Sequence, residues 1–159
     1  MNQSLFQRKP DWLKVRFPSG KNYNRINKLV DGSKLNTICK EAKCPNIAEC
    51  WNKGTATILI LGDVCTRNCS YCSVKKGAPK KLDLDEPRKA AEMINKLKLK
   101  YAVLTSPTRD DLADGGASVF AETISEIKKS NCKVEVLTPD FKGVSNVAED
   151  IAASFASTR

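Results

Sequence analysis

The chain has 159 residues, of which 41% are hydrophobic and 28% are charged. This length fits one ordinary domain, and the composition allows a packed core and argues against wholesale disorder. The sequence contains no histidine, which excludes Ser-His and Cys-His nucleophilic sites and histidine-containing zinc sites. The formal net charge of +9 fits either a lysine-rich surface or an acidic macromolecular partner, and charge alone does not choose between them.

No apolar run approaches the roughly 20 residues of a membrane-spanning helix. Residues 1–8 lack the basic-then-apolar order of a secretory signal. The seven cysteines fall into two groups of three plus Cys132. An odd count in a chain without a secretory signal favours thiolate chemistry over a disulfide framework. We therefore expect a cytoplasmic protein that has no membrane partner.

Residues 1–54 are predicted to form an N-terminal extension. Pro10, Pro18, Ser19 and Gly20 interrupt residues 1–20, which favours an extended arm. Apolar side chains then recur at helical spacing over residues 23–30, and Gly32 follows as a stop. This pattern predicts a short amphipathic helix.

The first group of cysteines, Cys39, Cys44 and Cys50, has the spacing C-x4-C-x5-C. Pro45 stands where a short helix can begin, which places Cys50 on that helix and Cys39 on the turn before it. Free cysteines are often small buried hydrophobes. Three of them within twelve residues, among polar neighbours, favour ligation of a metal or a cluster.

The second group, Cys65, Cys69 and Cys72, follows the apolar run 57–62, which predicts a buried strand. The spacing C-x3-C-x2-C can turn three thiolates of one loop toward a common point. A cubane iron–sulfur cluster is held by cysteine thiolates and normally takes four. Three ligands would leave one iron open to a substrate or a cofactor.

Zinc is the alternative metal that these cysteines could bind. Structural zinc takes four ligands, commonly in C-x2-C pairs, and six cysteines sharing two zinc ions would suggest a basic nucleic-acid-binding module. Only Cys69 and Cys72 form such a pair. A predicted buried strand also lies between the two groups of cysteines, and a small zinc module would not contain such a strand.

Downstream, helix and strand patterns alternate. In order, they predict a helix over 85–98, a strand over 101–105, a loop over 106–116, a helix around 120–127, a strand over 134–137 and a helix around 144–155. Asp85 is expected to cap the first of these helices. The order implies an α/β fold with about three strand–helix units, right-handed crossovers and parallel strands.

Ligands of parallel α/β folds gather at the carboxyl ends of the strands. The cysteine loop and the loop 106–116 each follow a strand, so we expect them to open on the same face. Gly115 and Gly116 could present backbone N–H groups to a carboxylate, and Arg109 could pair with one. The same residues suit equally well a turn that needs glycine.

The cysteine loop, with Tyr71 before its last cysteine, resembles the cluster loop of radical S-adenosylmethionine (SAM) enzymes. Further stretches resemble the lipoyl synthase family, namely 9–13, 39–51, 54–57, 62–67, 109–112, 114–116 and 139–143. Two cysteine triplets in this arrangement distinguish that family from biotin synthase.

This resemblance implies a fold and an activity. The fold is a partial (βα) radical-SAM barrel, its first half over 55–159, preceded by a cysteine-containing extension over 1–54. The activity is radical-mediated insertion of two sulfur atoms at C6 and C8 of an octanoyl group on a lysine of a lipoyl carrier domain. The carriers would be E2 subunits of 2-oxoacid dehydrogenases and the glycine cleavage H protein, with a low-potential electron donor and no nucleic acid.

The resemblance also assigns two [4Fe–4S] clusters. Cys65, Cys69 and Cys72 would hold the cluster whose open iron binds S-adenosylmethionine, and Tyr71 would lie near the adenine side of that cofactor.

The first triplet, Cys39, Cys44 and Cys50, would hold the auxiliary cluster, which serves as the sulfur donor in the family.

The sequence departs from the family pattern in two places. Residues 106–108 are Ser-Pro-Thr, where the family usually has Ser-Val-Asp. The Arg-Ser-Ser-Tyr motif that carries the family's serine ligand to the auxiliary cluster is absent. The family barrel also needs about twice as many strand–helix units. We therefore expect that the chain is truncated. A further hypothesis is that the chain alone is inactive.

Overall fold

The structure, a computed structural model, describes residues 10–15, 17–33, 35–142, 144 and 147–156. Its centre is a four-stranded sheet in the order β1-β2-β5-β6. The strands are β1 (Asn36–Thr37), β2 (Thr55–Leu59), β5 (Tyr101–Thr105) and β6 (Lys133–Leu137). A separate two-stranded sheet joins β3 (Val64–Cys65) to β4 (Lys75–Lys76).

The three longer strands of the main sheet are parallel, and β1 pairs with β2 in the antiparallel direction. Leu59 of β2 is in register with Thr105 of β5, which is in register with Leu137 of β6. The three strands therefore end at one edge of the sheet, and the loops that follow them begin there. This confirms the predicted parallel α/β arrangement and the common face of the loops; the barrel remains a prediction.

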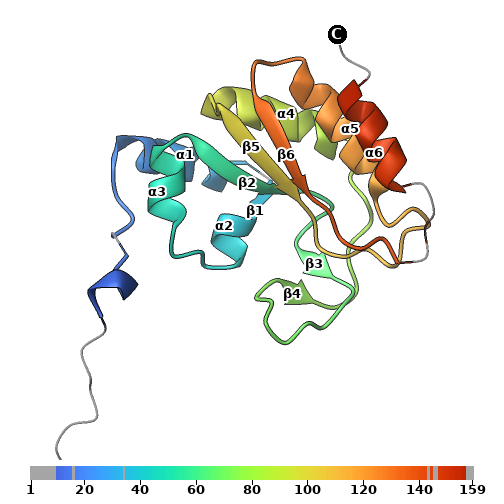
Figure 1. Cartoon of the computed structure of the whole chain (residues 1–159), viewed down its shortest axis with the longest axis horizontal. Coiled ribbons are helices and arrows are strands. Elements are labelled where there is room, and N and C mark those ends of the chain that lie inside the picture. Colours follow the sequence, from blue (N-terminus) through green and yellow to red (C-terminus); the bar gives the residue numbers. More distant parts are fainter. Residues whose placement is uncertain (1–9, 16, 34, 143, 145–146, 157–159) are drawn as a thin grey trace, which may run out of the picture.

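The helices form two groups (Figure 1). Helices α4 (Glu86–Leu97), α5 (Ala117–Lys128) and α6 (Val147–Ala156) lie side by side, because α5 packs against both of the others. Helices α1 (Lys21–Asp31), α2 (Ile38–Glu41) and α3 (Ile47–Asn52) gather near β1 and β2. A short 3-10 helix, Asp11–Leu13, precedes them.

The core lies between the sheet and the helices. Trp51, Phe120, Ile58 and Leu104 are each fully buried or nearly so. Helix α4 turns its apolar stripe inward, and α5 contributes Phe120 and Ile124 from positions four residues apart, as an amphipathic helix requires. Alternate residues of two strands contribute to this core, Ala56 and Ile58 from β2 and Ala102 and Leu104 from β5, because successive side chains of a strand point to opposite faces.

The predicted helices are present, with some boundaries and details corrected. Cys39 lies on the short helix α2 and not on a turn, and the helix that carries Cys50 begins at Ile47, two residues after Pro45. Asp85 occupies the N-cap position of α4, but its side chain makes no capping hydrogen bond. The acidic side chain that accepts a hydrogen bond at the start of α4 is that of Asp83, whose Oδ1 accepts the Asp85 N–H at 3.0 Å.

The first parallel strand also differs from the prediction over 57–62. It begins at Thr55 and ends at Leu59, because the backbone turns sharply at Leu61, where φ is +67°. The chain then continues through Gly62 into the cysteine loop. None of the helices in the described part of the chain is long and apolar enough to cross a membrane.

Candidate iron–sulfur site

Three loops meet at the edge of the sheet where β2, β5 and β6 end. The first contains Cys65, Cys69 and Cys72, the second covers residues 106–116, and the third begins after Leu137. The first loop is braced by pairing of β3 with β4 and by a hydrogen bond from the Gly77 N–H to the Cys65 carbonyl at 3.0 Å. Cys65 is therefore fixed by backbone contacts.

The Cys65 side chain is buried, and its sulfur accepts two backbone N–H groups. The Arg67 N–H donates at 3.4 Å from within the same loop, and the Thr108 N–H donates at 3.3 Å from the loop after β5. Hydrogen bonds of this kind stabilise a thiolate and tune the potential of an iron–sulfur cluster. The stretch Ser-Pro-Thr, which differs from the family pattern, thus still supplies a hydrogen-bond donor to Cys65 through the Thr108 N–H.

Cys69 and Cys72 are half-buried, and the Cys72 N–H donates to the Cys69 carbonyl at 3.2 Å. Tyr71 between them is 90% exposed. The pKa of its hydroxyl is raised, first by a hydrogen bond with Cys69 and then by the nearby thiol charges. Tyr71 therefore lies at the mouth of the loop beside Cys69, and its predicted contact with adenine remains a prediction.

The first and second loops are joined at Thr66. Its N–H and its Oγ1 both donate to the Thr108 carbonyl at 3.0 Å. Its Oγ1 also accepts the Asp110 N–H at 3.2 Å. These bonds tie the cysteine loop directly to the loop that follows β5.

Arg67 connects all three loops. Its guanidinium donates two hydrogen bonds to the Asp110 carboxylate, at 2.9 and 2.8 Å, and a third to Asp140 at 2.8 Å. These ion pairs raise the pKa of Arg67 and lower those of Asp110 and Asp140. A planar guanidinium suits this forked arrangement, because it offers parallel N–H donors to a carboxylate.

The other cysteine triplet lies on and between α2 and α3. Cys39 is buried, Cys44 and Cys50 are half-buried, and the Cys44 N–H donates to the Cys39 carbonyl at 3.0 Å. Burial raises the pKa of Cys50, and the charges of Cys39 and Cys44 raise it further. The three cysteines therefore lie within one short segment, on two helices and the turn between them.

All seven cysteines are unpaired, so both triplets keep their thiols. Among the described residues, no three Cys, Asp or Glu side chains are already gathered at metal-binding geometry. The chemistry of the donors nevertheless fits an iron–sulfur cluster, because each triplet offers thiols and Cys65 already accepts two N–H groups. Near the first triplet, the buried Thr37 Oγ1 and Trp51 Nε1 find no hydrogen-bond partner within the described chain.

Arg109 and the two glycines have different roles from the predicted ligand contacts. The Arg109 guanidinium is already paired with Asp111, at 2.9 and 2.8 Å. The Gly115 N–H donates to the Leu112 carbonyl at 3.1 Å, and the Gly116 N–H donates to Asp114 Oδ1 at 2.9 Å. The turn interpretation therefore holds for these glycines, whose N–H groups are used within the chain.

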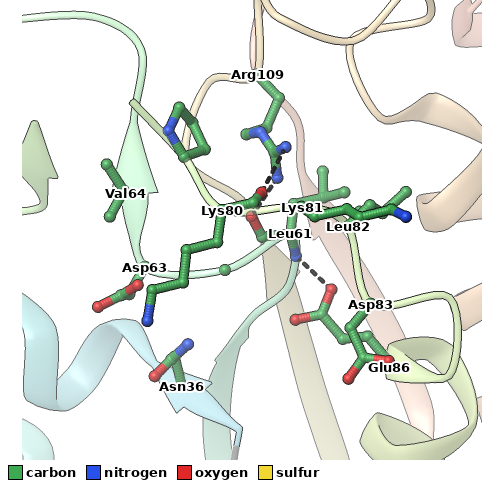
Figure 2. A pocket seen from close by; sticks show the side chains of 12 residues that line it. Asn36, Leu61, Asp63, Val64, Lys80, Lys81, Leu82, Asp83, Glu86 and Arg109 are labelled. Carbon is green, nitrogen blue, oxygen red and sulfur yellow. Dashed lines mark hydrogen bonds between the residues drawn. The ribbon is translucent and has the colours of Figure 1, made fainter. Parts of the chain in front are cut away.

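A polar cavity of about 340 Å³ is lined in part by Asp63 and Val64, which directly precede Cys65 (Figure 2). Arg109 and the buried carboxylate of Glu86 lie on opposite sides of Leu61 at this cavity. The sequence indicated Glu86 only as an opening residue of the helix over 85–98. Arg67 and Asp140 stood out only within the stretches that resemble the family. The sequence could have indicated the ion pairs of Arg67. Arg67, Asp110 and Asp140 lie in three loops that each follow a predicted parallel strand, and such loops meet at one edge of the sheet.

Comparison with known proteins identifies the class. The model of the Radical SAM superfamily matches residues 59–157, and the model of the N-terminal domain of lipoyl synthase matches residues 1–44. The chain belongs to the radical SAM superfamily.

Within that superfamily, the chain is similar to lipoyl synthases. It is 56% identical to that of Chloroflexus aurantiacus over 138 residues, which cover 86% of this chain and 45% of the relative. It is 52% identical to that of Roseiflexus sp. over 149 residues, covering 92% and 50%, and 55% identical to that of Rubrobacter xylanophilus over 137 residues, covering 85% and 43%. The chain spans about half the length of these curated relatives.

Proposed function

We propose that this chain carries the cluster-binding part of a lipoyl synthase. The reaction is the insertion of two sulfur atoms at C6 and C8 of an octanoyl group, which is attached to a lysine of a lipoyl carrier domain. The observation that carries the proposal is the cysteine loop Cys65–Cys72, held at the carboxyl edge of a parallel sheet and tied to both neighbouring loops. The similarity to lipoyl synthases supports the choice of substrate.

In this proposal Cys65, Cys69 and Cys72 hold one [4Fe–4S] cluster. When bound, that cluster supplies the electron that cleaves S-adenosylmethionine and starts the radical chemistry. The residues of the chain hold and orient it: Cys65 is fixed by backbone hydrogen bonds, and Arg67 ties the loop between the cysteines to its neighbours.

Cys39, Cys44 and Cys50 hold a second [4Fe–4S] cluster, which is the source of the inserted sulfur. Their place on α2, on α3 and in the turn between these two helices supports this assignment.

The proposed partners are octanoylated carrier domains, namely E2 subunits of 2-oxoacid dehydrogenases and the H protein of glycine cleavage, and a low-potential electron donor. We propose a cytoplasmic location, which the seven unpaired cysteines favour because thiols persist in reducing compartments. A basic zinc module for nucleic acid is not favoured, because β2, a strand of a parallel α/β sheet, separates the two triplets along the chain.

Iron and zinc analysis after anaerobic reconstitution tests the proposal. The wild-type chain should bind about eight irons, the content of two [4Fe–4S] clusters. Replacing Cys65, Cys69 and Cys72 by alanine should leave about four irons, and so should replacing Cys39, Cys44 and Cys50.

The variant Cys132→Ala is the matched control, because Cys132 belongs to neither triplet and should keep the full iron content. Tightly bound zinc with negligible iron would contradict the proposal. Nucleic-acid binding that weakens steeply with salt would then favour the zinc module.

A further inference from the structure

Leu61 adopts a backbone conformation that few residues other than glycine adopt. Its φ is +67°, and the next residue, Gly62, has a φ of +89°. Leu61 lies two residues after the end of β2 and four residues before Cys65. A left-handed conformation is unfavourable for leucine, because it brings the Cβ too close to the following carbonyl oxygen. It persists only where the surroundings hold it in place.

Glu86 holds the N–H group of Leu61. Its Oε2 accepts that N–H at 2.6 Å, which is a short hydrogen bond to a carboxylate. Glu86 is the first residue of α4 and is only 7% exposed. A buried carboxylate is costly unless polar groups compensate it. The Leu61 N–H is such a group.

Arg109 holds the carbonyl group of the same leucine. Its Nη1 donates to the Leu61 oxygen at 2.8 Å, and its Nη2 donates to the Lys80 oxygen at 3.3 Å. The guanidinium is only 3% exposed and is oriented by its forked pair with Asp111. Figure 2 shows Arg109 and Glu86 on opposite sides of Leu61.

The side chain of Leu61 is also confined. It is 1% exposed and packs against the N-terminus of α5, where a Cβ added to Gly116 would overlap its methyl groups. Three separate parts of the fold therefore fix this one residue: α4 through Glu86, the loop after β5 through Arg109, and α5 through Gly116.

We propose that Glu86 and Arg109 are positioning residues for the cluster bound by Cys65, Cys69 and Cys72. They hold Leu61 in the left-handed turn that directs the chain from the end of β2 into the cysteine loop. This inference rests on the proposed function, since it assigns the pair a role toward that cluster. The other triplet lies upstream of β2, and none of the contacts described above joins it to Leu61, so we expect it to keep its cluster when this turn is disturbed.

The two triplets provide an internal comparison for the test. In the full chain reconstituted with iron and sulfide, Glu86→Ala should lose about four of about eight irons, because only the loop after Leu61 is released. Glu86→Gln should keep both clusters, since the amide oxygen still accepts the Leu61 N–H. Arg109→Lys should also lose iron from the Cys65 site, because a lysine cannot make the forked contacts.

A second readout needs no iron. In the apoprotein, hydrogen exchange of the Leu61 amide should speed up about tenfold or more in Glu86→Ala, as expected for loss of a hydrogen bond to a charged group. Exchange of the amides around Cys39 and Cys50 should be unchanged. Glu92→Ala is the control on the same helix, because Glu92 lies on the solvent side and pairs with Arg88.

Each other outcome overturns a different part of the proposal. Full iron in both Glu86→Ala and Arg109→Lys overturns the positioning role, and so does equal loss of iron from both triplets, which would mark a general effect on folding. If the wild-type chain takes up no iron, the proposed function fails. The exchange of the Leu61 amide then decides alone whether Glu86 holds the turn. If Glu86→Ala does not fold, Arg109→Lys and Glu86→Gln decide.

Discussion

The carboxyl group of Glu86 lies beneath the turn at Leu61, with little access to water. Burial raises its pKa above the ordinary glutamate range, against the lowering effects of the Leu61 and Gly62 N–H groups and of Arg109. The nearby Asp83 adds to the increase. The folded protein therefore binds the proton of Glu86 more tightly than the unfolded chain does.

This pKa shift predicts a pH dependence of stability. Between the ordinary pKa of glutamate and the raised pKa of Glu86, the folded state binds more protons, so the free energy of unfolding falls as pH rises. The variant Glu86→Gln cannot titrate and should lack this slope. Urea unfolding of both proteins at a series of pH values measures the difference, in which other groups cancel. A difference that does not change with pH would show that Glu86 titrates normally.

Gly116 provides a second prediction at the residue scale. Its φ is +93°, and an added Cβ would overlap Leu61, whereas Gly54 has a φ of +77° and open space around it. Gly54→Ala should therefore cost roughly 1–2 kcal/mol of unfolding free energy from the backbone alone.

Gly116→Ala should cost about 1–3 kcal/mol more than that, because Leu61 must move from its packed position. Urea denaturation of the two variants measures this difference directly. Equal losses would mean that Leu61 yields at no cost, which would weaken its description as a confined residue.

At the scale of elements, the three loops after β2, β5 and β6 form one unit through Arg67. Lysine at position 67 would keep the charge but not the forked contact with Asp110 and the additional bond to Asp140. We expect faster hydrogen exchange in the cysteine loop of the Arg67→Lys apoprotein. The effect should shrink at high salt, because the ion pairs are partly exposed and salt screens them.

The matched control is Arg88→Lys. Arg88 also pairs with a carboxylate, that of Glu92, but on the outer surface of α4. Exchange in the cysteine loop should be unaffected by this substitution. If Arg67→Lys behaves in the same way, the three loops are held together by their backbone bonds alone.

The longer elements were predictable from the sequence because they repeat a pattern. Helix α4 buries one face along its length, and every second residue of strand β5 is buried. Both arrangements produce a clear periodicity in the sequence. Strands β1, β3 and β4 have two residues each and carry no such pattern. Their existence depends on partners far along the chain, as when Val64 pairs with Lys75.

The candidate site was predictable in its ligands but not in its supports. Cysteine spacing is a local property, so the sequence alone is enough to single out Cys65, Cys69 and Cys72. The contacts of Glu86 and Arg109 with Leu61 span 25 and 48 residues. No local pattern predicts such bonds, because they arise only when α4 and the loop after β5 are brought to the same edge of the sheet.

At the scale of the whole molecule, the fold separates two cysteine triplets while keeping both in one chain. One triplet lies among short helices packed near β2, and the other lies in the loop at the carboxyl edge of the parallel strands. This arrangement gives each triplet its own surroundings. This separation is consistent with our proposal of two clusters that have different roles.

We propose that the loop Cys65–Cys72 holds a cluster with one iron open to S-adenosylmethionine. The direct measurement uses the chain with Cys39, Cys44 and Cys50 replaced by alanine, reconstituted, reduced, and studied by electron paramagnetic resonance with and without S-adenosylmethionine. We predict about four irons per chain and a spectrum that changes when S-adenosylmethionine is added. A cluster whose spectrum does not respond, or a chain that takes up only zinc, would contradict the claim.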